Sequence, residues 1–119
     1  MDQSALPDDV RRLMPLTPAV FYVLLSLSAG ARHGYAIMQE TKALSTGSFR
    51  MGPATLYSTI QRLVTLDLVH ETESSGEDSR RRYYELTDLG RSLLREEVAQ
   101  LNSVVTMANA RLAPGAMQE

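Results

Sequence analysis

Three short helical segments, two short strands and one long helix follow one another along this chain of 119 residues. Thr17-Pro18 and Gly52-Pro53 are typical helix starts, and Thr87 supplies a third cap. The two strands alternate apolar and polar residues around a polar turn. The predicted elements are helices over residues 18–29, 34–45 and 53–65, strands over 68–73 and 80–86, and a last helix that begins at 88 and ends by 113. The expected fold class is mainly α with a β-hairpin.

Three helices followed by a β-hairpin is the order of the winged helix-turn-helix fold. In that fold the third helix enters the major groove of DNA, and the hairpin, or wing, lies along the flanking backbone or minor groove. The chain length fits one such domain and leaves little room for another. We therefore divide the chain into an N-terminal arm (1–15), a winged helix-turn-helix DNA-binding domain (16–86), a C-terminal dimerisation helix (87–113) and a flexible tail (114–119). A short helical piece is expected near residues 8–14 of the arm.

The helix predicted over residues 53–65 has two chemically different faces. Leu56, Ile60 and Leu63 recur at helical spacing and form the buried face. The opposite face carries short hydrogen-bonding side chains and one cation: Thr55, Ser58, Thr59 and Arg62. Hydroxyls can donate to phosphate oxygens or base edges, and Arg can pair with a phosphate or a guanine. A helix that merely faces water usually carries Glu and Lys instead, so this composition favours a DNA-reading helix.

The net charge of −2, from 12 cations and 14 acids, removes the simplest argument for nucleic-acid binding. Its distribution is more informative, because Arg50 and Arg62 bracket a segment without acids. Arg80, Arg81 and Arg82 form a cationic patch on the second wing strand, suited to phosphates or a narrow minor groove. Four acids lie close by, in the first wing strand and the turn: Glu71, Glu73, Glu77 and Asp78. The alternative interpretation of the Arg triplet is a solvated hairpin edge that resists aggregation.

The last helix carries an apolar repeat with spacings of 4, 3, 4, 3 and 4 residues: Leu94, Val98, Leu101, Val105, Ala108 and Leu112. This pattern is typical of a helix that packs along a partner helix. The repeat predicts a homodimer formed through this helix, because the helix outruns the small domain that it leaves. The alternative is packing on the first helix of its own domain.

Several function classes find no support. The chain has no Cys, which excludes thiolate metal sites and cysteine nucleophiles, and no catalytic constellation or glycine-rich phosphate loop is evident. We therefore expect neither an enzyme nor a metal or cofactor. Glu96 and Glu97 are most simply interpreted as a solvated face of the last helix. The apolar run over residues 19–29 is too short to span a bilayer, and we expect a cytoplasmic protein without membrane contact.

Four short motifs stand in order along the chain: Leu16-Thr17-Pro18-Ala19-Val20-Phe21, His33-Gly34-Tyr35-Ala36-Ile37, Gly52-Pro53-Ala54-Thr55-Leu56-Tyr57 followed by Arg62-Leu63, and Arg81-Arg82-Tyr83-Tyr84-Glu85-Leu86-Thr87 followed by Gly90. Together they resemble PadR-type transcriptional regulators over about residues 16–112. The single short C-terminal helix resembles the small branch of that family.

The resemblance implies a homodimer that binds operator DNA, usually as a repressor, and that a small-molecule effector sometimes releases. It also implies that Tyr35 and Tyr57 stand near the DNA backbone. By spacing alone, Tyr57 lies on the flank of the buried stripe, where either a phosphate contact or simple packing is possible. Two-fold symmetry predicts a palindromic operator with half-sites about one turn, ~10 bp, apart.

Two departures from the family pattern bear on this interpretation. The wing turn is acidic and lacks a Gly-x-Pro before the basic strand, which puts the wing contacts in doubt. The chain also has no Trp with which to stack a planar ligand at the dimer helix. The acidic turn and the net charge favour a second hypothesis, a winged-helix protein-interaction module without DNA binding. The Thr/Ser face and the Arg triplet disfavour it.

Overall fold

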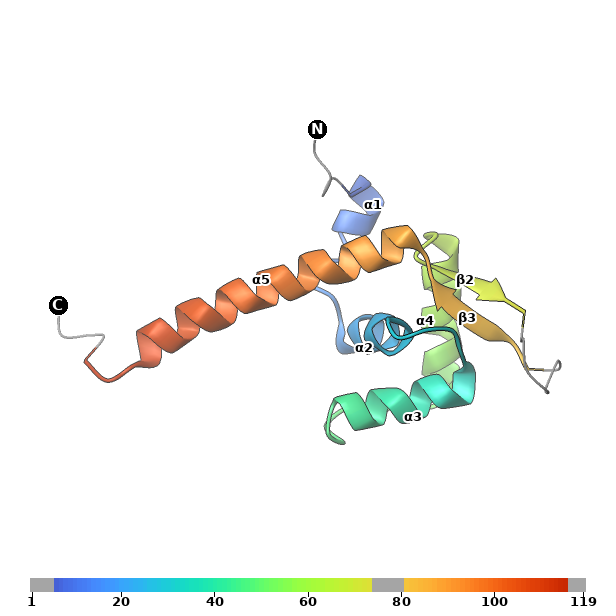
Figure 1. Ribbon diagram of the computed structural model, residues 1–119, viewed down its shortest axis with the longest axis horizontal. Helices are drawn as coiled ribbons and strands as arrows, with labels where there is room; N and C mark the ends of the chain where they lie inside the picture. The colour runs from blue at the N-terminus through green and yellow to red at the C-terminus, as the bar shows by residue number, and fades with distance from the viewer. Residues whose placement is uncertain (1–5, 74–80, 116–119) are drawn as a thin grey trace.

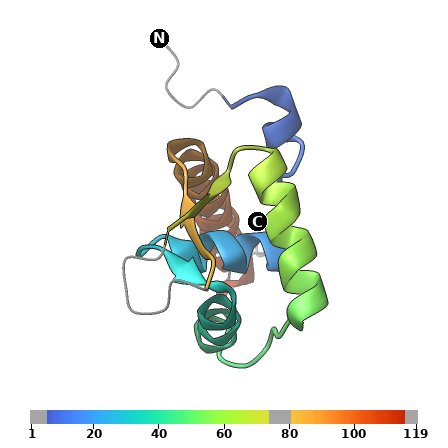
Figure 2. The same ribbon diagram turned by 90° about the vertical axis from the view of Figure 1, so that its right-hand side faces the viewer.

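The computed structural model describes residues 6–73 and 81–115, and apart from a short strand before the third helix its elements follow the predicted order (Figures 1 and 2). The helices are α1 (Asp8–Arg11), α2 (Pro18–Leu27), α3 (Gly34–Leu44), α4 (Pro53–Thr65) and α5 (Asp88–Leu112), and the strands are β1 (Arg32–His33), β2 (Val69–Thr72) and β3 (Tyr83–Leu86). The fold class is thus mainly α with a small antiparallel sheet, as predicted. The predicted turn at 74–79, Arg80 and residues 116–119 lie outside the described residues.

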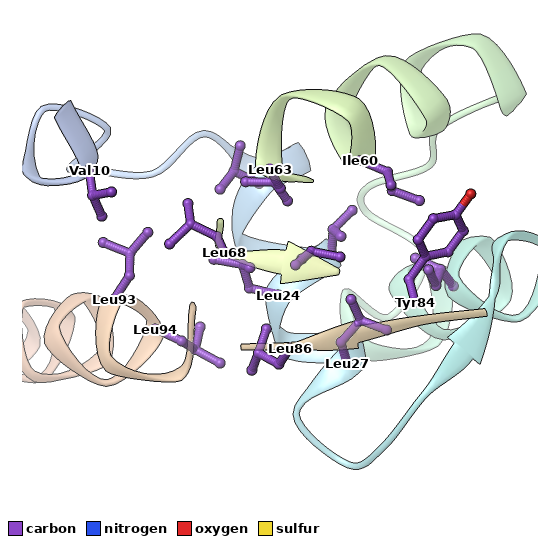
Figure 3. Close-up of a cluster of buried hydrophobic side chains, with 14 of the residues drawn as sticks. Val10, Leu24, Leu27, Ile60, Leu63, Leu68, Tyr84, Leu86, Leu93 and Leu94 are labelled. Carbon is purple, nitrogen blue, oxygen red and sulfur yellow. The ribbon is translucent and has the colours of Figure 1, made fainter. Parts of the chain in front are cut away.

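Helix α2 is the centre of the domain and packs against α3, α4, α5 and β3. Thr17 caps it, since its hydroxyl oxygen accepts a hydrogen bond of 3.3 Å from the amide of Val20. The helix ends at Leu27, two residues before the predicted end, where Gly30 adopts a φ of +144° that favours glycine. Figure 3 shows buried side chains of α2 and of the elements packed on it: Val10, Leu24, Leu27, Ile60, Leu63, Leu68, Tyr84, Leu86, Leu93 and Leu94.

The wing is a sheet of three strands, where the sequence predicted a hairpin of two. The strand order is β1-β3-β2, and β1 adds Arg32 and His33 opposite Tyr84 and Tyr83. Strand β1 was missed because two residues carry no periodic signal of their own. The strands of the hairpin are shorter than predicted, but the predicted faces of β3 are confirmed, with Tyr84 and Leu86 buried and the alternate residues only half-buried.

The predicted helix bounds hold closely for α3 and α4. Helix α4 spans the predicted residues and turns its apolar positions inward. Helix α3 ends one residue early, at Leu44, and the Ser45 hydroxyl oxygen that follows it accepts a hydrogen bond from the amide of Phe49. Residues 49–51, which the sequence predicts as a short extended piece between the two helices, lie outside any strand.

The N-terminal segment contributes to the core. Leu6 and Val10 are buried in the main cluster, and Figure 3 shows Val10 beside Leu93 of α5. The expectation that Glu97 lies on a solvated face is wrong: its side chain is only 4% exposed. Its Oε2 accepts a hydrogen bond of 3.2 Å from the amide of Leu16, so the carboxylate ties α5 to the segment that leads into α2.

Only the first turns of α5 pack against the winged domain. Leu93 and Leu94 are buried, whereas every residue from Val98 to the end of the helix is exposed. Figure 1 shows this half projecting away from the rest of the molecule. Five residues of the predicted heptad repeat lie there: Val98, Leu101, Val105, Ala108 and Leu112. No helix in the described ranges is long and apolar enough to cross a membrane.

The start of α5 lies unusually close to the backbone at Leu68. A Cβ on Gly90 would collide with the carbonyl oxygen of Leu68. Because that oxygen belongs to the backbone, relieving the clash would require the main chain to shift. Gly90→Ala is therefore expected to lower the free energy of unfolding by about 2–3 kcal/mol, measured by urea denaturation. Gly52→Ala is the control, because a Cβ there meets nothing within 4 Å. Equal effects of the two substitutions would contradict the close approach.

Candidate nucleic-acid interface

The outer face of α4 is open to solvent. Thr55, Ser58 and Arg62 are exposed and Thr59 is half-buried, so the four predicted side chains share one accessible face. The Ser58 hydroxyl donates to the Thr55 carbonyl oxygen at 3.1 Å, which leaves its lone pairs free to accept. Gly52 makes no side-chain cap, and Pro53 stands at the first turn. The first amides of α4 are therefore available to an anion.

Beside α4 lies a hollow of about 620 Å³, which we call the wing hollow. It is formed by the start of α3, by α4 and by β3 with the residues just before it. Its lining residues are His33, Gly34, Tyr35, Tyr57, Arg81, Arg82 and Tyr84. The structure thus brings together four of the predicted DNA contacts, Tyr35, Tyr57, Arg81 and Arg82, from three separate parts of the chain. No acid lines the described part of this hollow.

Gly34 sets the position of the Tyr57 ring. A Cβ on Gly34 would overlap the Tyr57 hydroxyl and the ring carbon that bears it, so only glycine lets the ring lie over the start of α3. Tyr57 is nevertheless 48% exposed and Tyr35 is 59% exposed. Both side chains therefore reach the surface, and Tyr57 packs on α3 with only part of its ring.

His33 connects the wing to α3. Its Nδ1 accepts a hydrogen bond of 3.2 Å from the amide of Ala36 and so caps the helix. Its Nε2 lies 2.7 Å from Nη1 of Arg81, and its ring packs edge-on against Tyr83. The base of the wing is consequently held against the start of α3.

Arg82 lies between an acid and a tyrosine. Its Nε is 3.6 Å from Oε2 of Glu71, and its side chain also hydrogen-bonds Tyr84. Burial raises the pKa of Tyr84, and the nearby Glu71 adds to the effect while Arg82 opposes it. Tyr84 therefore stays protonated at neutral pH. The other described acid of the sheet, Glu85, pairs with His70 at 3.1 Å.

The remaining predicted residues lie apart from the wing hollow. Arg50 is on the far side of Tyr35, in the segment before α4. Arg80 lies outside the described residues, as do Glu77 and Asp78 of the acidic turn. Sequence reasoning did not propose His33, Gly34 or Tyr84 as members of the site. The first two were visible only as part of a motif, and Tyr84 was assigned to the buried face of its strand.

The profile of the "Transcriptional regulator PadR-like family" matches residues 23–96, which include α3, α4, the wing and the start of α5. This match covers more than half of the chain. The protein belongs to the PadR-like family. It is therefore a member of a family of DNA-binding transcriptional regulators, not of an enzyme family.

Two relatives share sequence with this PadR-like protein. An uncharacterized protein X of Lysinibacillus sphaericus is 36% identical over 70 residues, 58% of this chain and 64% of the relative. An uncharacterized 37.1 kDa protein in transposon TN4556 of Streptomyces fradiae is 38% identical over 84 residues, 71% of this chain and 23% of the relative. The chain thus spans less than two thirds of the length of either relative.

Solved structures share the winged-helix fold. A transcriptional regulator from Clostridium thermocellum superposes with a TM-score of 0.67 at 22% identity, covering 91% of this chain and 99% of that one. A PadR family regulator from Clostridium difficile R20291 gives 0.68 at 20% identity, with coverages of 82% and 100%. BpsR of Bordetella bronchiseptica, whose DNA binding is regulated by 6-hydroxynicotinic acid, gives 0.62 at 26% identity, with coverages of 96% and 76%.

The dependence of Tyr57 on Gly34 is testable. In Gly34→Ala the half-exposed Tyr57 ring should swing away from α3, with little loss of stability, because the far end of a flexible side chain gives way. We expect DNA affinity to fall by about 1.5 kcal/mol, the worth of one hydrogen bond to a charged group. Fluorescence anisotropy measures the affinity and thermal unfolding the stability. Tyr57→Phe, which keeps the ring and removes the hydroxyl, should lower the DNA affinity by a similar amount. Unchanged DNA affinity in both variants would contradict a DNA contact by the Tyr57 hydroxyl.

Proposed function

We propose that this PadR-like protein is a sequence-specific transcriptional repressor. It binds a palindromic operator as a homodimer, with α4 of each protomer in the major groove. The observation that carries the proposal is the arrangement of α4 beside the wing hollow. The outer face of α4 offers hydroxyls and Arg62, and the adjoining hollow is lined by two arginines and three tyrosines without a described acid.

The outer face of α4 and the wing hollow have different roles in the proposed recognition of DNA. In the major groove, Thr55, Ser58, Thr59 and Arg62 are positioned to meet base edges and phosphates. The wing hollow supplies cations and hydroxyl donors for the backbone, which fix the register without reading sequence. The local charge explains how a chain with a net charge of −2 can hold DNA. In the wing, Glu71 is drawn to Arg82 and Glu85 to His70, so these acids do not stand free in the sheet.

Arg62 tests the assignment of α4 as the recognition helix. It is exposed and makes no ion pair with any described residue. Arg62→Ala should cost about 1–3 kcal/mol of operator binding and relax the base preference at one position per half-site. The measurement is an anisotropy titration against the region upstream of the protein's own gene, with a random duplex for comparison.

Arg12→Ala serves as the matched control, because Arg12 is exposed and follows α1, at the opposite edge of the molecule from α3. An Arg62→Ala variant that binds like the parent would mean that α4 is not the recognition helix. Absence of binding by the parent protein to any duplex would favour the interaction-module hypothesis.

The proposed homodimer rests on the outer half of α5. Val98, Leu101 and Val105 are between 43% and 54% exposed, and Leu112 is 81% exposed. These side chains lie at the spacing of a coiled-coil seam, and nothing in the described part of the chain covers them. A second α5 would bury this seam, while Leu94 packs within its own protomer.

Leu101→Glu should convert the dimer into a monomer of about 13.2 kDa. Because Leu101 is exposed in the protomer, the substitution leaves the winged domain folded and places a buried charge only in the pair. Light scattering after size exclusion measures the mass, and circular dichroism checks the fold. Ser103→Glu, which puts the same charge away from the repeat, should stay dimeric. A dimeric Leu101→Glu variant would place the interface elsewhere.

Release by a small-molecule effector is part of the proposal. BpsR offers the precedent, since 6-hydroxynicotinic acid regulates its DNA binding. In this chain a hollow of about 490 Å³ lies where the end of α2 meets α5, lined among others by Ser28, Leu94 and Val98. A ligand at this place would touch both the domain core and the proposed dimer helix. A thermal-shift screen of the purified protein tests whether such a ligand exists.

A further inference from the structure

A second hollow, which we call the turn groove, lies on the other side of Tyr35. It has a volume of about 720 Å³ and is formed by the outer face of α3 and the segment that joins α3 to α4. Its lining includes Tyr35, Met38, Gln39, Lys42, Arg50 and Met51. Because Tyr35 lines both hollows, the turn groove continues the wing hollow along α3.

The walls of the turn groove are held in place by specific contacts. The buried Ser45 hydroxyl oxygen accepts a hydrogen bond of 3.0 Å from the amide of Phe49. The Phe49 ring stacks on Tyr22 of α2, with ring centroids 5.7 Å apart. The amide of Gly47, at a φ of +83°, donates to the Lys42 carbonyl oxygen at 2.8 Å and so closes the end of α3. The groove is therefore a formed part of the fold.

Among the described residues, the charged side chains that line the turn groove are all cations. Lys42 and Arg50 are exposed, and neither makes an ion pair with a described residue. Glu40, the acid on the same helix, instead lies 3.7 Å from Arg32. The Tyr35 hydroxyl accepts a hydrogen bond of 3.2 Å from the Gln39 amide, so its own proton is free to donate outward.

We propose that the turn groove binds the phosphate backbone of the DNA, with Lys42 and Gln39 as further contact residues beside Arg50 and Tyr35. This inference rests on the proposed function and extends its footprint along α3, away from the wing. Two cations without an ion pair among the described residues, a donating hydroxyl and a side-chain amide suit phosphate oxygens. The continuity with the wing hollow through Tyr35 allows one backbone strand to follow both.

The experiment measures how DNA affinity depends on salt. A labelled duplex of random sequence suffices, since phosphate contacts carry non-specific binding. The full-length protein and Lys42→Gln are titrated by anisotropy between about 50 and 200 mM salt. Lys42→Gln should weaken binding on random and upstream duplexes alike and make the slope of log affinity against log salt shallower by about one per protomer. Gln39→Glu, which adds an acid to the groove, should weaken binding on both duplexes as well.

Arg12→Ala again controls for the loss of one exposed cation and should keep the parent slope. The inference would be overturned if Lys42→Gln kept the salt slope of the parent protein and Gln39→Glu kept its DNA affinity. A loss of operator affinity in Arg62→Ala would, in that case, still support the proposed function. If the parent itself binds no duplex at low salt, both the inference and the proposed function fail. A loss confined to the upstream duplex would also overturn the inference, because it would make Lys42 a base-reading residue.

Discussion

The backbone of Leu68 holds α4, the wing and α5 together. Its amide donates to the Leu63 carbonyl oxygen at 2.8 Å and so ends α4, while its carbonyl oxygen accepts from the amide of Thr87 at 3.1 Å. The Thr87 hydroxyl also donates to the carbonyl oxygen of Asp67 at 2.7 Å. Gly90 lets α5 approach this peptide closely. Three elements thus meet at one residue, so backbone contacts as well as side-chain packing fix the angle between α4 and α5.

This junction matters for the proposed function, because a dimer that reads two half-sites needs a fixed distance between its recognition helices. Each α4 is tied to its own α5 at Leu68. Glu97 adds a second tie two turns later, where its carboxylate holds the amide of Leu16 ahead of α2. Its Oε1 is buried and has no hydrogen-bond partner in the described residues, which costs free energy. Glu97 therefore positions α5 against the segment before α2 at the expense of some stability.

The sequence predicted the elements whose signals are local. Gly52-Pro53 marked the start of α4 correctly, and Thr87 caps α5 through the amide of Gly90 as expected. What it missed depends on distant contacts. Strand β1 exists only through pairing with β3, about fifty residues further along the chain. Glu97 is buried by a partner 81 residues away, so helical spacing could not place it.

The same distinction holds for the candidate site. The face of α4 followed from helical periodicity alone, since Leu56, Ile60 and Leu63 are buried and the Thr/Ser/Arg side is accessible. The wing hollow could not be derived in this way, because it needs the start of α3, Tyr57 and the residues before β3 to converge. The resemblance to PadR-type regulators named Tyr35 and Tyr57, yet only the structure shows that the missing side chain of Gly34 leaves room for the Tyr57 ring.

Helix α5 takes part in both folding and the proposed assembly, and this sets how an effector could act. Its first turns are in the core through Leu93 and Leu94, and its outer half has no support within the described chain. A shift between two partnered α5 helices would therefore act at the boundary near Leu94 and Val98. Because the junction at Leu68 is backbone-bonded, that shift would move α4 with α5 as a unit instead of bending between them. Release of DNA would then follow from a changed spacing of two intact recognition helices.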